Sequence, residues 1–230
     1  MRAHRAHHTP LSATVTLSPE ESEHLRVLRA SVGDAVTVFD GAGLEASGRI
    51  LSLEAQVTLE LGPPKPVSLE PPQSVTLAVA LLKGDKLAEV VRGATELGVA
   101  RVQLLITDHA DAKDIGTQKL ERLRRIALEA SKQCGRGIVP EVLEPIKLRD
   151  LELNGVGLVA HPRSTRLPRE TVNWDSPVTV ATGPEGGFSS LEITALERLG
   201  FMTVTLGRRI LRAETAPTAL LGAIVAGEGL

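Results

Sequence analysis

The stretch TGPEGGF, residues 182–188, decides the fold of this 230-residue chain together with a second stretch, LGRRILRAET, residues 206–215. Each follows a short apolar run typical of a buried parallel strand, and each leads into a segment of helical character. Strand, glycine turn and helix in this order form a ligand crevice at the carboxyl ends of the strands of an open α/β sheet. The two stretches therefore predict an α/β sheet whose ligand site lies at the glycine turns.

The first turn contains two adjacent glycines, Gly186 and Gly187, which allow positive φ and let the backbone approach a ligand with no Cβ in the way. Ser189 and Glu192 have the spacing of a capping box, so we expect a helix to begin just after the glycines. A glycine turn alone is as often a tight structural turn as a ligand loop. The three arginines of the second stretch favour a ligand site, because charge in a connection between buried elements needs a reason.

The composition is that of an ordinary globular protein, with 42% hydrophobic and 23% charged residues. A formal net charge of −2 does not indicate a nucleic-acid binder, so any RNA-binding surface must be local. The chain has three phenylalanines, one tryptophan and no tyrosine. Stacking of bases on aromatic side chains is therefore not expected to be the main mode of recognition.

Cysteine and histidine usage indicates a cytoplasmic protein without a metal site. Cys134 is the single cysteine, which excludes an internal disulfide, and we expect a half-buried helix residue rather than a nucleophile. His4, His7 and His8 have no cysteine or carboxylate at ligand spacing, so no metal is expected. No apolar run is long enough to span a membrane, and the basic N-terminus lacks the apolar core of a signal peptide.

Two domains are expected, at residues 1–68 and 73–230, because the hydrophobic period changes along the chain. From residue 34 to residue 61 apolar residues alternate around turns, which predicts a small antiparallel β-barrel. Residues 62–72 hold five of the 14 prolines and indicate a stiff linker. Beyond them strands and helices alternate, which predicts a parallel sheet with helices on both faces.

Basic residues gather on the N-terminal arm, on the helix expected after Ser18, and on a long helix expected over residues 119–133. The long helix and the residues that follow it carry six positive charges against two glutamates. A solvated helix face and an RNA-facing surface explain this excess equally well. The RNA-binding candidates are Arg2, Arg5, Arg26, Arg29, Arg125 and Arg136.

Eight segments carry a family likeness: HLRVLR (24–29), FDG (39–41), LKGDK (82–86), TELGV (95–99), QCGR (133–136), AHPR (160–163), GPEGGF (183–188) and LGRRILRAETA (206–216). In these segments and in their order, the chain resembles the 16S ribosomal RNA uracil-N3 methyltransferases of the SPOUT class. The likeness covers nearly the whole chain, and its last two segments are the most specific. It implies a PUA-like β-barrel domain that binds RNA and a SPOUT α/β domain with a parallel sheet and a C-terminal trefoil knot. It further implies S-adenosylmethionine as cofactor, a homodimer, and 16S rRNA or the small ribosomal subunit as substrate.

The resemblance also implies which residues meet the cofactor and the substrate. The cofactor-binding residues would be Ala160, His161, Pro162, Thr182, Gly183, Glu185, Gly186, Gly187, Leu206, Gly207, Ile210, Leu211 and Arg212. Methyl transfer to uracil N3 needs in-line positioning and removal of the N3 proton. Arg212 is the catalytic candidate that stabilises charge developing on a uracil carbonyl, and Glu214 would orient it. A purely structural Arg–Glu pair is the alternative.

Other functions stay open, and one further expectation concerns assembly. A SPOUT methyltransferase acting on another RNA would share the cofactor site, whereas a non-catalytic ribosomal-RNA-binding protein would not bind the cofactor. A nucleotide-phosphate enzyme is disfavoured, because the chain has neither a Walker-type loop nor a dinucleotide fingerprint. The helix expected over residues 215–227 is apolar nearly all round, which predicts that it belongs to the dimer interface.

Overall fold

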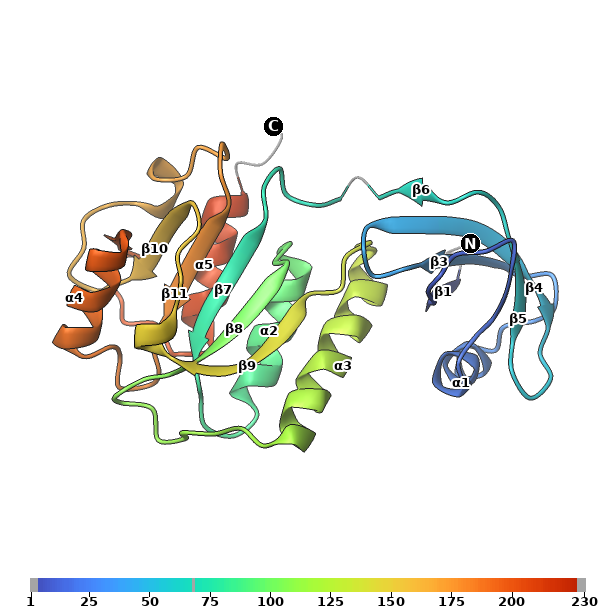
Figure 1. The fold of residues 1–230 in the computed structure, drawn as a ribbon, viewed down its shortest axis with the longest axis horizontal. Coiled ribbons are helices and arrows are strands. Elements are labelled where there is room, and N and C mark those ends of the chain that lie inside the picture. The colour runs from blue at the N-terminus through green and yellow to red at the C-terminus, as the bar shows by residue number, and fades with distance from the viewer. Residues whose placement is uncertain (1–3, 68, 227–230) are drawn as a thin grey trace. The chain divides into compact units, whose positions relative to one another are not determined.

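The structure is a computed structural model that describes residues 4–67 and 69–226. The chain forms two compact units (Figure 1). The first comprises Met1–Glu70 and Ser131–Val139, and the second comprises Pro71–Ala130 and Pro140–Leu230. The sequence-based division placed residues 131–139 in the second domain, whereas in the structure they pack within the first unit.

The first unit is built on a six-stranded sheet of order β1-β3-β4-β5-β2, with β6 paired to β4. Its strands are β1 (His4–His7), β2 (Thr14–Thr16), β3 (Ala35–Phe39), β4 (Leu44–Ser52), β5 (Thr58–Leu61) and β6 (Lys65–Pro66). The antiparallel pairing predicted for residues 34–61 is confirmed for β3, β4 and β5, whereas β1, which lies outside that range, runs parallel to β3. The connection between these two strands contains β2 and a helix, which makes it long enough for a parallel return.

The core of the first unit lies on one side of this sheet, where Leu17, Leu25, Val38, Ile50 and Leu59 are fully or almost fully buried. Leu25 comes from α1 (Pro19–Val27), which begins as its sequence predicts. The Ser18 side chain accepts a hydrogen bond from the N–H of Glu21, and proline occupies the first turn.

Part of the proline-rich stretch belongs to the first unit rather than to a free linker. Residues Lys65–Pro66 form β6, which pairs with Leu44 and Glu45. The N–H of Val67 donates to the carbonyl of Gly43. Proline is tolerated in a strand at a sheet edge, where its missing N–H costs no ladder hydrogen bond.

Residues 131–139 complete the first unit by pairing with the turn between β3 and β4. Ile138 forms β-bridges with Gly41 and Ala42. The N–H of Val139 donates to the carbonyl of Gly41, and the N–H of Gly43 donates to the carbonyl of Gly137. These backbone hydrogen bonds make a late segment of the chain an integral part of the N-terminal unit.

The second unit contains six parallel strands in the order β12-β10-β11-β7-β8-β9, as the alternation of strands and helices predicts. The strands are β7 (Val75–Ala80), β8 (Arg101–Ile106), β9 (Glu141–Lys147), β10 (Val156–Ala160), β11 (Val178–Thr182) and β12 (Phe201–Val204). The helices are α2 (Lys86–Glu96), α3 (Thr117–Cys134), α4 (Ser190–Leu199) and α5 (Thr215–Val225), with 3-10 helices at Leu148–Asp150 and Pro168–Glu170. None of the helices among the described residues is long and apolar enough to cross a membrane.

Helices cover both faces of this sheet. Ala78, Val159 and Ala181 share a buried cluster with Leu196 of α4 on one face. Helices α2 and α5 pack together, and α5 also contacts β11. Figure 1 shows α2 and α5 side by side on the face opposite α4.

The last strands of the sheet interlace. Strand β12 lies beside β10, although β11 precedes it in the chain and sits between β10 and β7. The segment after β10 runs alongside β12, since the N–H of His161 donates to the carbonyl of Val204 and the N–H of Thr205 donates to that of Arg166. The expected trefoil knot stays a prediction.

Candidate cofactor site and RNA-facing surface

A cavity of about 430 Å³ lies at the carboxyl ends of β10, β11 and β12. Such a volume is typical of small-molecule sites, and this edge of a parallel sheet is where α/β proteins bind ligands. Every predicted cofactor residue except Arg212 lines the cavity. The other residues of its wall are Pro184, Phe188, Ile193, Arg209, Ala213 and Ala216.

The chemistry of the wall suits a ligand with a flat apolar ring and a few polar edge atoms, as an adenosine has. Apolar side chains, among them Phe188, Leu206 and Leu211, form much of the lining. Thr182 is 1% exposed, and its hydroxyl has no hydrogen-bond partner among the described residues. A buried hydroxyl without a partner is costly, so a polar ligand atom at this position would stabilise it.

The glycines of the first turn serve different purposes. Gly187 has a φ of +70°, as a tight turn requires, whereas Gly186 does not have positive φ. A Cβ on Gly186 would lie 3.0 Å from the Cβ of His109, so glycine is needed there for close packing rather than for backbone freedom. A Cβ on Gly183 would lie 2.9 Å from the backbone nitrogen of Phe188, which closes the turn on itself.

The loop after β8 positions this turn, a role that the sequence did not reveal. Nδ1 of His109 lies 3.1 Å from the carbonyl oxygen of Gly187 and 3.3 Å from that of Gly186. The N–H of Asp108 donates to Oε1 of Glu192, and the Asp108 carboxylate accepts a hydrogen bond from the Ser189 hydroxyl. Ser189 and Glu192 also form the predicted capping box, which begins α4 at the cavity wall.

Lys86, the first residue of α2, is a second residue whose role at the site the sequence did not indicate. Its ammonium donates to Oε1 of Glu185 at 2.8 Å and lies 3.6 Å from Oε2 of Glu214. The hydrogen bond to Glu185 and the two nearby negative charges raise the pKa of Lys86, against the opposing effect of desolvation. Burial alone would raise the pKa of Glu185, but hydrogen bonds from Lys86 and from backbone N–H groups lower it overall.

Arg212 and Glu214 lie beside the cavity rather than in its wall. The Arg212 side chain is 86% exposed, and its Nη1 lies 3.9 Å from Oε1 of Glu214. Arg212 does not line the cavity and its side chain extends into solvent, which does not support the cofactor-binding role predicted for it. Its carbonyl accepts hydrogen bonds from two N–H groups of the first turn of α5. Glu214 is 15% exposed, and its Oε2 is buried without a hydrogen-bond partner among the described residues.

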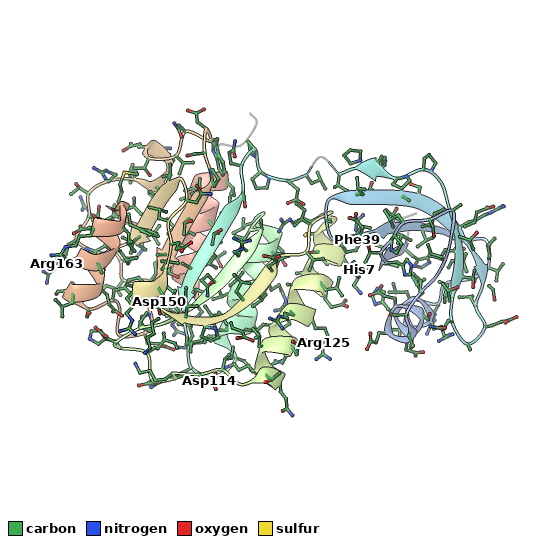
Figure 2. The ribbon with its side chains drawn as sticks, in the orientation of Figure 1. His7, Phe39, Asp114, Arg125, Asp150 and Arg163 are labelled. Carbon is green, nitrogen blue, oxygen red and sulfur yellow. The ribbon has the colours of Figure 1, made fainter. Side chains whose placement is uncertain are left out.

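Two of the RNA-binding candidates are engaged inside the first unit. Arg5 pairs with Glu45 at 2.9 Å, donates to the carbonyl of Arg136, and lies 4.7 Å from the ring centroid of Phe39. Arg136 is 3% exposed and pairs with Glu70. Figure 2 shows Phe39 beside His7, whose ring meets it edge-on at 5.3 Å. These settings do not support phosphate contacts by Arg5 or Arg136.

The remaining RNA-binding candidates differ in whether their side chains already bind other groups of the protein. Arg2 lies outside the described residues. Arg26 donates to the carbonyls of Glu54 and Ala55, whereas Arg29 is exposed. Most cations of the long helix are also used internally: Lys119 donates to the carbonyl of Gly84, Arg122 pairs with Asp85, Arg124 pairs with Glu121, and Lys132 pairs with Glu21.

Arg125 is the exception on this helix. Within the described part of the chain it has no hydrogen-bond or ion-pair partner, and its side chain is exposed. Figure 2 shows it projecting from α3 away from the sheet of the second unit. Among the candidates that the structure describes, Arg29 and Arg125 are therefore those whose guanidinium groups are available to a phosphate.

A parallel α/β sheet with a cavity at two C-terminal glycine turns, joined to a small N-terminal β unit, defines the class of SPOUT methyltransferases with a PUA-like domain. A family model described as an RNA methyltransferase domain matches residues 69–225, and one described as an RNA methyltransferase PUA domain matches residues 17–60. The chain belongs to this RNA methyltransferase family.

Individual relatives agree with this assignment. The chain is 37% identical to the ribosomal RNA small subunit methyltransferase E of Synechocystis, a match covering 93% of this chain and 73% of the relative. A methyltransferase of Legionella pneumophila solved with bound S-adenosylmethionine has a TM-score of 0.90 and 31% identity, covering 98% of both chains. The ribosomal RNA small subunit methyltransferase E of Neisseria gonorrhoeae, also bound to S-adenosylmethionine, has a TM-score of 0.89 and 30% identity, covering 96% of both chains.

Proposed function

We propose that the protein is an S-adenosylmethionine-dependent methyltransferase of small-subunit ribosomal RNA, and that it methylates N3 of one uridine. The observation that carries the proposal is the cavity at the glycine turns, whose buried Thr182 hydroxyl lacks a partner among the described residues. Family membership and the S-adenosylmethionine-bound relatives support the cofactor and the RNA class. The choice of uracil N3 rests on the motif resemblance. A ribosomal RNA substrate is also consistent with the expected cytoplasmic location.

The wall of the cavity would hold the cofactor mostly through backbone groups and apolar contacts. The Thr182 hydroxyl would bond to a polar edge of the ligand, and Leu206 and Leu211 would contact its ring. S-adenosylmethionine supplies an electrophilic methyl group carried on a sulfonium. The protein contributes chiefly by holding the reacting groups in line and by excluding water.

Arg212 would act on the nucleotide rather than on the cofactor. It is exposed beside the cavity, where a uracil carbonyl entering from solvent could accept its hydrogen bonds. Loss of the N3 proton puts negative charge on the uracil carbonyls, and a fixed guanidinium stabilises such charge. Glu214, 3.9 Å from Arg212, would orient the guanidinium.

The first unit would anchor the RNA. It matches a PUA domain model, and Arg29 offers an exposed cation there. Contacts of this kind bind phosphates without reading sequence, so the target uridine would be read at the cavity. Arg125 on α3 would add a second phosphate contact.

A homodimer that uses α5 completes the proposal. Pro217, Leu220, Leu221 and Ile224 are buried within the protomer, whereas Gly222 and Ala223 are only half-buried. A Cβ on Gly222 would meet no atom of residues 4–67 or 69–226 within 4 Å, so these residues leave this face of the helix open. Sedimentation at micromolar concentration checks the dimer, and a monomer would contradict it.

Two measurements test the catalytic proposal. Calorimetry should show one S-adenosylmethionine site per chain, and nucleotide mapping by mass should find one 3-methyluridine missing from the 16S rRNA of a deletion strain. A purified protein that does not bind S-adenosylmethionine would leave the non-catalytic RNA-binding function. An unchanged set of 16S rRNA modifications in the deletion strain would exclude this substrate.

A further inference from the structure

A single lysine connects two segments of the cofactor site that are far apart in the sequence. Strands β7 and β11 are parallel neighbours, so the residues that follow them meet at the same edge of the sheet. Lys86 follows β7 at the start of α2, and Glu185 follows β11 in the glycine turn. The two side chains form a hydrogen bond of 2.8 Å although they are 99 residues apart.

The other carboxylate near Lys86 belongs to a second segment that lines the cavity, the one that leads into α5. Glu214 is the residue before α5, and its neighbours Ala213 and Ala216 line the cavity. Its buried Oε2 lies 3.6 Å from the Lys86 ammonium, while its Oε1 faces Arg212. Helices α2 and α5 pack together, which brings the start of α2 close to the start of α5.

Charge explains why a cation is needed at this point. Glu185 and Glu214 approach the same ammonium, so without it two carboxylates would face each other in a partly buried setting. Two neighbouring negative charges repel each other, which favours protonation of one of the two carboxylates. The backbone N–H of Lys83 also donates to Glu185, at 3.3 Å, but carries no net charge to offset the repulsion.

We propose that Lys86 is a positioning residue of the methyl-transfer site. By joining Glu185 to Glu214 it holds the glycine turn after β11 against the segment that enters α5, and both segments line the cofactor cavity. Lys86 does not line the cavity, so it acts through the two carboxylates and not by touching the cofactor. The proposal rests on the function proposed above, since it assumes that S-adenosylmethionine occupies this cavity.

Two neighbouring contacts hold Lys86 itself in place. Arg122 of α3 pairs with Asp85 at 2.5 Å, and Lys119 of α3 donates to the carbonyl of Gly84 at 2.8 Å. Both contacts fix the turn that leads into α2. These two cations of α3 therefore support the cofactor site indirectly, whereas Arg125, the RNA-binding candidate on α3, takes no part in these contacts.

The test compares three full-length variants by calorimetry with S-adenosylmethionine. Lys86→Met keeps the length of the side chain and removes its charge, and we expect its Kd to rise about tenfold. Lys86→Arg keeps the charge and should bind within about threefold of the unchanged protein. Lys83→Met is the matched control, because Lys83 is three residues away and, within the described ranges, its side chain pairs only with the exposed Asp111. Its Kd should not change.

A thermal unfolding midpoint recorded for each variant separates positioning from stability. An exposed ion pair that served only stability would move the midpoint of Lys86→Met and leave the Kd unchanged, which would overturn the proposal. A Lys86→Arg variant as weak as Lys86→Met would overturn it as well. If the unchanged protein fails to bind S-adenosylmethionine, the proposed function falls first. If it binds and Lys86→Met binds equally well, only the role of Lys86 is refuted.

Discussion

The ammonium of Lys132 lies 2.6 Å from Oε1 of Glu21, and both side chains are more than nine-tenths buried. Glu21 uses its other carboxylate oxygen to accept the N–H of His7 from strand β1. An ion pair between residues 111 positions apart thus fastens the last turn of α3 to α1 and β1 within the first unit.

Breaking this pair should destabilise the protein strongly. Lys132→Met leaves the Glu21 carboxylate buried without its cation, and loss of one partner of a buried pair costs about 3–5 kcal/mol. Equilibrium unfolding in urea measures the change. Arg49→Met is the matched control, because its pair with Glu60 is exposed and such pairs contribute about 0–1 kcal/mol. Equal effects of the two variants would contradict the structural role of Lys132.

Substitution of two cavity glycines should reduce cofactor binding for different reasons. No protein atom lies within 4 Å of a Cβ on Gly207, so the side chain of Gly207→Val would enter the cavity and crowd the ligand, apart from strain at its φ of +102°. The side chain of Gly186→Val would instead collide with His109 and distort the turn.

A second substitution separates the two causes. His109→Gly removes the Cβ that a side chain at position 186 would meet at 3.0 Å, so it should partly restore S-adenosylmethionine binding to Gly186→Val, although it also removes the Nδ1 contacts to the turn. It should not help Gly207→Val. Calorimetry on the double variants reads this difference, and full binding by both single variants would exclude the turns as the cofactor site.

Arg212→Ala should lower kcat far more than cofactor affinity, because its guanidinium acts on charge that develops at the uracil. Its side chain is 86% exposed, so stability should change by less than about 0.5 kcal/mol. Tritium transfer to RNA gives the rate, and calorimetry gives the affinity. Arg208→Ala, an exposed arginine of the same loop, is the control. An unaltered rate in Arg212→Ala would return Arg212 to the structural alternative.

The stability contributed by the Lys86–Glu185 pair should depend on pH only at the extremes. The pKa of Glu185 is lowered from its ordinary value of 4.5, so its contribution is present above that pH and is lost as the pH falls through the lowered value. The pKa of Lys86 is raised above 10.5, so its contribution is present below that pH and is lost as the pH rises through the raised value.

Thermal midpoints of the unchanged protein and Lys86→Met should therefore differ by a constant amount between these limits. The difference should shrink in acid below the ordinary pKa of glutamate. Asp85 and Arg122 pair with each other in both proteins, so their contribution largely cancels in the comparison. A difference that changes steadily across neutral pH would show that another group controls it.

Reversal of charge at Arg29 should weaken RNA binding and its dependence on salt. Each phosphate contact that is lost lowers the slope of log K against log salt by about one. Arg29→Glu should show this loss with unchanged cofactor affinity, while Arg49→Glu on the same unit serves as control. Arg26 is a poorer probe, because its guanidinium holds the carbonyls of Glu54 and Ala55. An unaltered salt slope in Arg29→Glu would remove Arg29 from the RNA surface.

Local patterns in the sequence predicted the helices and strands better than the contacts that these elements make with one another. The Ser189–Glu192 capping box, the Ser18 cap and the parallel α/β unit are confirmed, because each depends on neighbouring residues. Strand β9 was not predicted, since it is an edge strand interrupted by Pro145 with only Val142 buried. An edge strand that contains a proline and is mostly exposed has no continuous apolar run to reveal it.

The contacts around the site depend on strand order, which no local period encodes. His109 follows β8 and Lys86 follows β7, and neither adjoins the glycine turns in the sequence. They reach the turn after β11 only because β7 lies between β11 and β8. The ion pairs of Arg5 and Arg136 could not be predicted either, because a pattern of charges in the sequence does not show which arginines pair with carboxylates inside the fold.

Because residues 131–139 complete the first unit, that unit is not a detachable module. A gene fragment that stops within the proline-rich stretch encodes Glu21 and Glu70 without Lys132 and Arg136, and the remaining fragment encodes the two cations alone. Recombination between relatives at that stretch would therefore combine mismatched halves of these two ion pairs. The two units must be inherited together, and substitutions at Glu21 and Lys132 should be selected as a pair.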